Sequence, residues 1–422
     1  MKRTVYQRMS YYHKEGDLKM TVTTTKNITT LATYTWPQGF YSDGLNAGLR
    51  EGKKDMGWLY SEVPAAAAGV YTTNQFQAAP TKLTKQTIEA THHLQAMIMN
   101  SANANSCTGV QGAQNAALMQ AWTAQKLGIA PELVGVASTG IIGEQLPMGV
   151  IEAGLDHLQL TKNDAVTTAI LTTDLHPKTI SIQFELDGQT VTMSGFAKGS
   201  GMIHPNMATM LGFVTTDAQI TGDQLQKLLS QEVDETFNQI TVDGDTSTND
   251  MVVALANGMA NNQTLTPDQE DYDTFVAAFH QVLSFLAQSI AQDGEGASKL
   301  VETDVIGALN HDEAQMVAKA IVGSNLVKAA IFGEDPNWGR LMGAIGQTDA
   351  HVDVDHVSIW FNGLLIVKNS QAALFDAAEM KASLGESVVK IKVDLNSGEG
   401  TGQAWGCDLT YQYVKINAAY HS

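Results

Sequence analysis

Hydrophobic and polar residues alternate with a period of two in several short runs, the pattern of half-buried β-strands. One run covers residues 180–186 and reaches Asp187-Gly188, a dipeptide that favours a tight hairpin turn. A second hairpin is expected at residues 359–367 around Asn362-Gly363, and a further strand at residues 389–395. These hairpins predict sheets that are largely antiparallel.

Helical periodicity occurs between the predicted strands. Apolar residues fall on one helical face at residues 225–237, and a second helix is expected from a capping box at Thr266-Pro267 to just before Gly294. A third is expected at residues 112–127, with Gly128 as its C-cap. Helices interleaved with antiparallel hairpins indicate layered α/β structure and not a dinucleotide-binding domain.

Composition narrows the function classes. The 422 residues are 44% hydrophobic and 16% charged, enough for a large core and two lobes. A formal net charge of −19 argues against nucleic-acid binding, which needs a basic surface. Residues 1–20 lack the apolar stretch of a signal peptide, and no apolar run reaches membrane-spanning length, so we expect a cytoplasmic protein with a poorly ordered N-terminal extension.

Two polar segments look like ligand loops but lack the required spacing. The glycine-rich residues 198–201 match neither of the common phosphate-binding patterns. Residues 243–250 begin like a calcium loop, but Thr248 stands where that loop needs glycine and Ala254 where it needs glutamate. The two cysteines have no metal-site spacing. We therefore expect no metal and no organic cofactor.

A threonine at the entry to a predicted strand offers specific chemistry. Residues 199–206 are polar and turn-prone, and they lead into Ala208-Thr209 and a buried apolar strand at residues 210–214. A threonine hydroxyl in such a place can attack the preceding carbonyl and cleave the chain, and its new α-amine can then act as base for its own hydroxyl. From this segment alone, an ordinary strand-entry threonine remains the simpler interpretation.

Several separate blocks carry a family resemblance that favours the chemical interpretation. They lie at residues 65–74, 100–109, 199–217, 240–250 and 332–340, within a match from about Leu31 to Ser422. In this order they resemble the glutamate N-acetyltransferase (ornithine acetyltransferase) family, in which an Ala-Thr bond is cut and the threonine becomes the nucleophile. The resemblance implies cleavage between Ala208 and Thr209.

The resemblance also implies roles for individual residues. Thr139 and Gly140 match the oxyanion-hole pair, whose hydroxyl and backbone N–H stabilise a developing negative charge. Besides Thr209, the implied substrate-binding positions are Thr172, Lys198, Glu295, Asn417 and Ser422. A lysine suits a substrate carboxylate, and a glutamate suits a substrate ammonium.

The family's fold and reaction follow as expectations. The implied fold consists of two-lobed, layered α/β sandwiches. Cleavage would give an α chain that ends at residue 208, whose folded lobe covers residues 21–208, and a β chain of residues 209–422. The implied reaction moves an acetyl group from N-acetylornithine to glutamate in arginine biosynthesis, with acetyl-CoA as a further donor to be tested. The implied assembly is an α2β2 heterotetramer.

Two other functions remain open at this point. A related self-processed amidohydrolase or aminopeptidase would use the same threonine but release its product to water, and a non-catalytic binding protein would keep the fold without cleavage. The chain also departs from the family pattern. Ala102 stands where glycine is usual, and His421-Ser422 stand where arginine and threonine are expected.

Overall fold

Nine strands form the larger of the two main sheets. The computed structural model describes residues 10–14, 17–21, 28–204 and 210–419. The strand order is β3 (Thr29–Thr30), β8 (Lys178–Leu186), β9 (Gln189–Lys198), β10 (Leu211–Thr216), β12 (Met251–Ala256), β5 (Met56–Tyr71), β6 (His93–Asn100) and β7 (Val134–Ser138), with β4 (Phe40–Leu45) also paired to β5. Most neighbours are antiparallel, while the β10–β12 and β6–β7 pairs are parallel.

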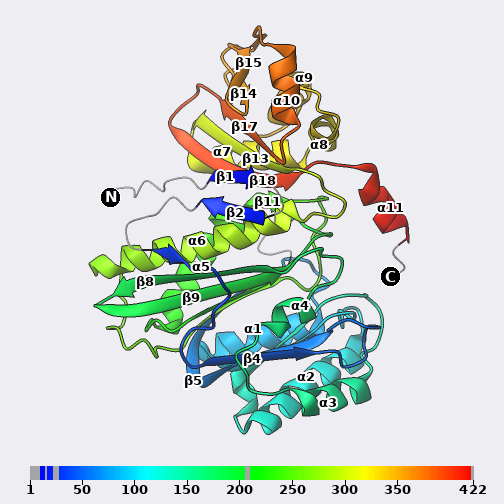
Figure 1. The fold of residues 1–422 in the computed structure, drawn as a ribbon, viewed down its shortest axis with the longest axis vertical. Coiled ribbons are helices and arrows are strands. Elements are labelled where there is room, and N and C mark those ends of the chain that lie inside the picture. Colours follow the sequence, from blue (N-terminus) through cyan, green and yellow to red (C-terminus); the bar gives the residue numbers. More distant parts are fainter. Residues whose placement is uncertain (1–9, 15–16, 22–27, 205–209, 420–422) are drawn as a thin grey trace.

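The long strand β5 folds this sheet into two facing halves. Its pairing with β6 shifts between Tyr60 and Ala65, and the sequence in between contains Pro64. A buried apolar cluster that includes Leu59, Phe196 and Phe213 fills the space between the halves. The arrangement is a layered sandwich, with helices on both outer sides (Figure 1).

Helices cover the outer faces of both halves. The helices α5 (Gly222–Glu235) and α6 (Glu270–Gln292) pack on the side of β8 and β9, and α2 (Gly109–Leu127) and α3 (Met148–His157) lie on the opposite side, as Figure 1 shows. The shorter α1 (Ala79–Thr91) and α4 (Ala165–Ala169) contact β7 and β4 respectively. Short 3-10 turns occur at Pro131–Leu133 and Phe237–Gln239.

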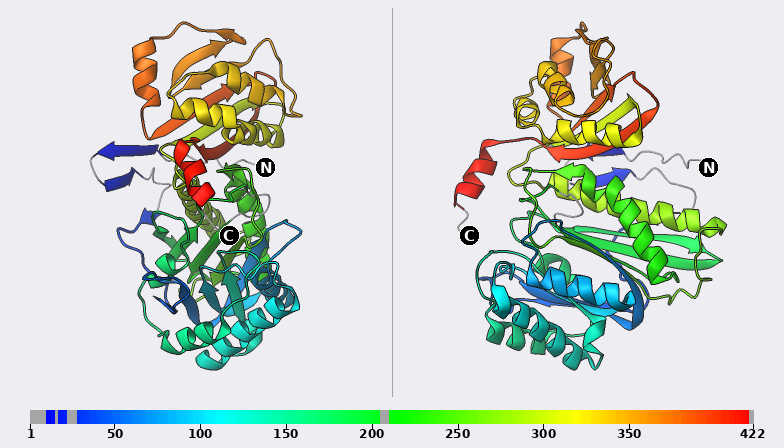
Figure 2. Two further views of the ribbon diagram at one scale, coloured as in Figure 1. Left: turned by 90° about the vertical axis from the view of Figure 1, so that its right-hand side faces the viewer. Right: turned by 180° about the vertical axis from the view of Figure 1, so that it is seen from behind.

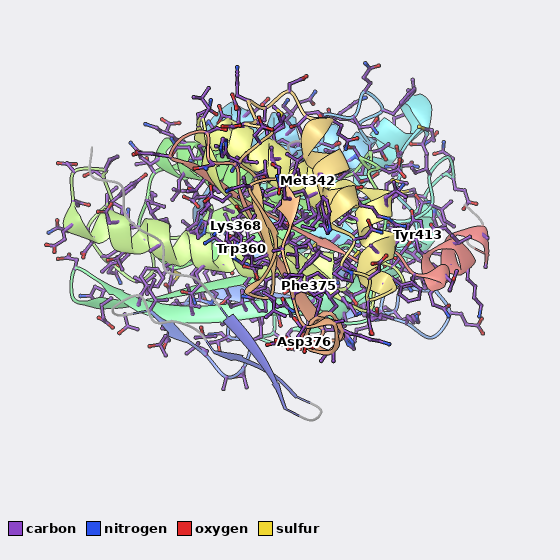
Figure 3. All side chains as sticks on the ribbon, turned by 90° about the horizontal axis from the view of Figure 1, so that it is seen from above. Met342, Trp360, Lys368, Phe375, Asp376 and Tyr413 are labelled. Atoms are coloured by element: carbon purple, nitrogen blue, oxygen red, sulfur yellow. The ribbon has the colours of Figure 1, made fainter. Side chains whose placement is uncertain are left out.

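A second body contains most of the C-terminal residues. Its sheet has the order β11 (Ile240–Thr241), β18 (Gly400–Cys407), β13 (Leu300–Ala308), β17 (Val388–Asp394), β14 (Ser358–Phe361), β15 (Leu364–Lys368) and β16 (Gln371–Ala372). The helices α7 (His311–Gly323), α8 (Asn325–Phe332), α9 (Trp338–Gly346) and α10 (Ala377–Leu384) share one buried apolar cluster with this sheet. A separate two-stranded ribbon, β1 (Ser10–Lys14) and β2 (Asp17–Thr21), projects from the molecule (Figure 3). The expected two-lobed, layered α/β class is confirmed.

Most local predictions are confirmed. The hairpin turns have positive φ angles at Asp187-Gly188 and at Asn362-Gly363, as tight hairpins require. The C-cap of α2 is Gly128, with φ of 69°. The helix expected from Thr266 begins only at Glu270, although the Thr266 backbone N–H donates to the Gln269 side chain at 2.9 Å, as in a capping box.

The apolar helix α6 is also long enough to cross a membrane. It is the one such helix in the described part of the chain, and 67% of its most apolar window is buried inside the protein. Residues Phe275, Phe279 and Leu286 on its apolar face belong to the main core cluster. Its hydrophobicity is therefore explained by packing on the nine-stranded sheet.

The C-terminal segment differs from its prediction. The alternation of Tyr411, Tyr413 and Ile416 predicts a strand tied into a sheet, but the structure has a helix, α11 (Tyr411–Ala419), with no buried residue. The helix lies at the edge of the molecule in the right-hand view of Figure 2, and in Figure 3 Tyr413 lies far from Trp360 of the seven-stranded sheet. The prediction was wrong because alternation over so few exposed residues carries no packing information.

Candidate active site

A cavity of about 160 Å³ opens where several strands of the nine-stranded sheet begin or end. Lys198 ends β9 and pairs with Leu211 at the start of β10. Residues 139–140 follow β7, and residues 247–250 precede β12. The cavity lining contains Thr139, Gly140, Thr172, Lys198, Glu295 and Asn417. Six of the predicted site residues therefore surround one space, although they come from widely separated segments.

Gly140 lies where any side chain would strain the backbone and overlap a neighbouring segment. Its φ is 133°, and a Cβ at this position would lie 2.2 Å from the carbonyl carbon of Ala102. The backbone N–H groups of Thr139 and Ile141 donate to Asn100 and Ala102 at 3.0 Å each. The N–H of Gly140 has no acceptor among the described residues, which leaves it available to a ligand.

Lys198 is buried and contacts Thr139. Its side-chain ammonium donates to the Thr139 hydroxyl at 3.3 Å, and the lysine is only 8% exposed. Burial lowers the pKa of Lys198, and this effect is opposed by the carboxylate of Asp174. Because the Thr139 oxygen accepts from the ammonium, its own O–H proton remains free to donate into the cavity.

A buried carboxylate fixes two segments of the cavity wall. Asp174 accepts the N–H of Thr172 at 3.0 Å and the N–H of Gly199 at 2.6 Å. It also pairs with Lys178, at 2.8 Å. Burial alone would raise the pKa of Asp174, but Lys198 and Lys178 hold it below its usual range. Asp174 therefore remains ionised and keeps both N–H groups in place.

Glu295 and Asn417 meet at the mouth of the cavity. The Asn417 amide donates to the Glu295 carboxylate at 2.8 Å. A Cβ on Gly201 would lie 2.4 Å from the same carboxyl group, so this glycine lets the chain pass close to Glu295. The contact brings the exposed helix α11 next to the end of α6.

Sequence reasoning missed the residues just before β12. Ser247, Thr248, Asn249 and Asp250 all line the cavity, and the Ser247 hydroxyl donates to the Asp250 carboxylate. Burial raises the pKa of Asp250 well above its usual value. The Asn249 amide donates to the carbonyl of Ser138, at 2.8 Å, and so supports the residue before Thr139. The motif at residues 240–250 was the available signal: it was recognised as part of the family resemblance and as unsuitable for calcium, but none of its residues was assigned to the site.

Three predicted positions, Ala208, Thr209 and Ser422, lie outside the described residues. The next residue after Thr209, Met210, lines the cavity. Among the described residues, no group of three or more His, Cys, Asp or Glu side chains is arranged to hold a metal ion.

Comparison with known proteins decides the family. The ArgJ family model matches residues 41–422, nearly the whole chain. The chain belongs to the ArgJ family. The arginine biosynthesis bifunctional protein ArgJ of Lactiplantibacillus plantarum is 64% identical over 403 residues, covering 96% of this chain and 100% of that protein. The protein of the same name from Streptococcus thermophilus is 54% identical over 387 residues, covering 92% and 98% respectively.

One solved ArgJ structure is also similar. The crystal structure of the arginine biosynthesis bifunctional protein ArgJ from Bacillus halodurans matches with a TM-score of 0.50 and 54% sequence identity. The match covers 100% of that solved chain but 50% of the chain described here. The ArgJ family is the one that the residue blocks resembled, so the sequence-based recognition is confirmed.

Proposed function

We propose that this chain is a glutamate N-acetyltransferase of arginine biosynthesis, which transfers an acetyl group from N-acetylornithine to glutamate through an acetyl-Thr209 intermediate. The observation that carries the proposal is the cavity that gathers Thr139, Gly140, Thr172, Lys198, Glu295 and Asn417 next to Met210. The names of the ArgJ relatives support the same assignment, since they are bifunctional proteins of arginine biosynthesis.

The proposed first half-reaction forms an ester on Thr209. The Thr209 hydroxyl attacks the acetyl carbonyl carbon while its proton passes to the α-amine that cleavage has freed. The Thr139 hydroxyl and the Gly140 N–H donate to the oxyanion. The C–N bond then breaks, the proton passes to the leaving nitrogen, and ornithine departs with its charges held by Lys198 and Glu295.

The second half-reaction reverses these steps with another amine. The α-amine of glutamate attacks the ester, the oxyanion forms in the same place, and the Thr209 hydroxyl is restored. Both substrates are amino acids, so one set of groups can hold both backbones. The buried ammonium of Lys198 supplies one further effect, because its donation to Thr139 polarises the hydroxyl toward the oxyanion.

Self-cleavage before Thr209 is part of the proposal. The solved Bacillus halodurans chain matches half of this chain along its whole length, which is what a cut near residue 209 would produce. Within the sheet, β10 lies between β9 and β12, and β12 lies next to β5. The two cleavage products would thus share one sheet, and we propose that two such pairs form a cytoplasmic α2β2 assembly. The word bifunctional in the relatives' names supports acetyl-CoA as a second donor.

The decisive experiment is an assay of the purified protein with glutamate and either acetylornithine or acetyl-CoA. Acetylglutamate is the expected product with acetylornithine. Free acetate in its place would favour the alternative of a self-processed amidohydrolase. A denaturing gel should show two fragments, one beginning Thr-Met-Leu-Gly, and Thr209→Ala should give a single chain. An uncut, inactive wild-type protein would favour the non-catalytic binding protein.

A further inference from the structure

A buried lysine lies behind the cavity wall and has no role in the mechanism above. Lys178 begins β8, and its side chain is 2% exposed. Its ammonium lies 2.8 Å from a carboxylate oxygen of Asp174 and 2.6 Å from one of Asp293. It also donates to the carbonyl of His176 at 3.3 Å. All three of its protons therefore have acceptors.

Each of the two carboxylates holds a different part of the wall. Asp174 accepts the N–H groups of Thr172 and Gly199, next to Lys198. Asp293 accepts the N–H of Leu175 at 3.0 Å, while its backbone carbonyl accepts the Ser200 hydroxyl at 2.7 Å.

One more hydrogen bond extends this network to Glu295, on another part of the cavity wall. The carbonyl of Ser200 accepts the N–H of Glu295 at 2.9 Å. Asp293 and Glu295 follow residue 209 in the sequence, and the other residues of the network precede it.

We propose that Lys178 is a positioning residue of the substrate site, which ties the wall at Thr172 and Lys198 to the wall at Glu295 by bridging Asp174 and Asp293. Burial makes the bridge necessary. The side chain of Asp174 is 0% exposed and that of Asp293 is 9% exposed, so without the shared cation two carboxylates would face each other in a poorly solvated space. They would separate or take up a proton, and either change would release backbone N–H groups that they now accept.

The charge balance of the wall supports this role. Two carboxylates, Asp174 and Asp293, lie with two ammonium groups, Lys178 and Lys198, and the four formal charges cancel. The carboxylates of Asp174, Asp250 and Glu295 all favour the charged form of Lys198, whereas the ammonium of Lys178 opposes it. Lys178 therefore offsets part of the negative charge around Lys198, so that a ligand carboxylate meets an ammonium that its neighbours neutralise less completely.

The test has two arms: enzyme kinetics, which rest on the proposed function, and hydrogen exchange, which does not depend on it. The variant Lys178→Met has a side chain of similar length but no charge. We expect its KM for N-acetylornithine to rise about tenfold or more, because displacing a binding group by about 1 Å has effects of at least that size. The factor by which KM rises should exceed the factor by which kcat falls. In the second arm, hydrogen exchange should become faster both in peptides that contain Gly199 and in peptides that contain Glu295.

The matched control is Lys299→Met. Lys299 is equally a buried lysine, 8% exposed and 3.4 Å from Glu334, but it does not line the cavity. Its loss should lower stability without changing KM. If Lys178→Met does not fold, Asp293→Asn keeps the side-chain shape, removes one charge of the bridge, and should raise KM in the same direction.

Two results would overturn the inference. One is an unchanged KM in a folded bridge variant, and the other is faster exchange near Gly199 with normal exchange near Glu295. A wild-type protein that transfers no acetyl group would instead refute the proposed function, and the exchange measurements would still decide the role of Lys178.

Discussion

Replacing Gly140 by alanine tests the proposed oxyanion hole at the backbone N–H of Gly140, where neighbouring backbone atoms leave no room for a side chain. The added Cβ would lie 2.2 Å from the carbonyl carbon of Ala102, 2.4 Å from its oxygen and 2.5 Å from the nitrogen of Asn103. All three are backbone atoms, so no side-chain rotation can relieve the overlap. The segment must retreat by about 1 Å to reach ordinary van der Waals distance, and the Gly140 N–H moves with it.

The magnitude has two parts. A positive φ costs a non-glycine residue about 1–2 kcal/mol, and overpacking a tight site costs about 1–3 kcal/mol, so the free energy of unfolding should fall by roughly 2–5 kcal/mol. Loss of one oxyanion donor typically lowers kcat by about 100- to 1000-fold. Acetyl transfer and urea denaturation, both measured on cleaved protein, separate these two effects.

Gly143 in the same loop supplies a matched control. It too has a positive φ, 89°, but a Cβ there would meet no atom within 4 Å. Gly143→Ala should therefore lose only the conformational part, about 1–2 kcal/mol of stability, and keep kcat within about threefold. If Gly140→Ala retains the same kcat as Gly143→Ala, the Gly140 N–H does not stabilise the transition state and the assignment of this residue is wrong.

Three further predictions concern the surroundings of the cavity. Ala102 has a φ of 76°, a backbone conformation that favours glycine, so Ala102→Gly should raise the urea midpoint by an amount equivalent to about 1 kcal/mol. A lowered midpoint would contradict this strain argument. The pKa of Asp174 is lowered in the folded protein, so its contribution to stability is complete above the unfolded pKa of about 3.9 and declines as the pH falls below it. The stability difference between wild type and Asp174→Asn should therefore shrink below about pH 4. A constant difference would exclude an ionic contribution. Truncation after Ile416 removes the Asn417 amide that contacts Glu295 and should raise KM for acetylornithine, while the protein still folds and cleaves. Wild-type kinetic constants in the truncated protein would exclude Asn417 from the site.

Local signals explain which parts of the fold could be predicted from the sequence. The turns at Asp187-Gly188 and Asn362-Gly363 need residues that tolerate positive φ, and the C-cap at Gly128 has the same requirement. Each of these features depends on a few adjacent residues, so it can be recognised without knowledge of the rest of the chain. The helix α11 had no such signal. It buries no residue, so packing imposes no helical period on its sequence.

The site was only partly predictable for a different reason. Thr139, Lys198 and Glu295 came from family resemblance, because nothing in their local sequence distinguishes them from ordinary loop residues. The bridge of Lys178 was missed because it joins residues far apart in the sequence, since Lys178 and Asp293 are separated by 115 positions. A lysine at the start of a strand is normally an exposed residue, and only the tertiary fold buries it between two carboxylates.

The position of the proposed cleavage point explains how one chain could be cut inside its active site without losing that site. Strand β10 begins two residues after Thr209 and pairs with β9 over six residue pairs, while β12 pairs with β5 over another six. Both outer partners precede residue 209, so the strands that follow the cut are held on each side by strands that precede it. Separation would break both ladders and expose the core between the sheet halves, including Phe196 and Phe213. The proposed cut would therefore cost little of the packing, and it would supply the free α-amine that the threonine needs as its base.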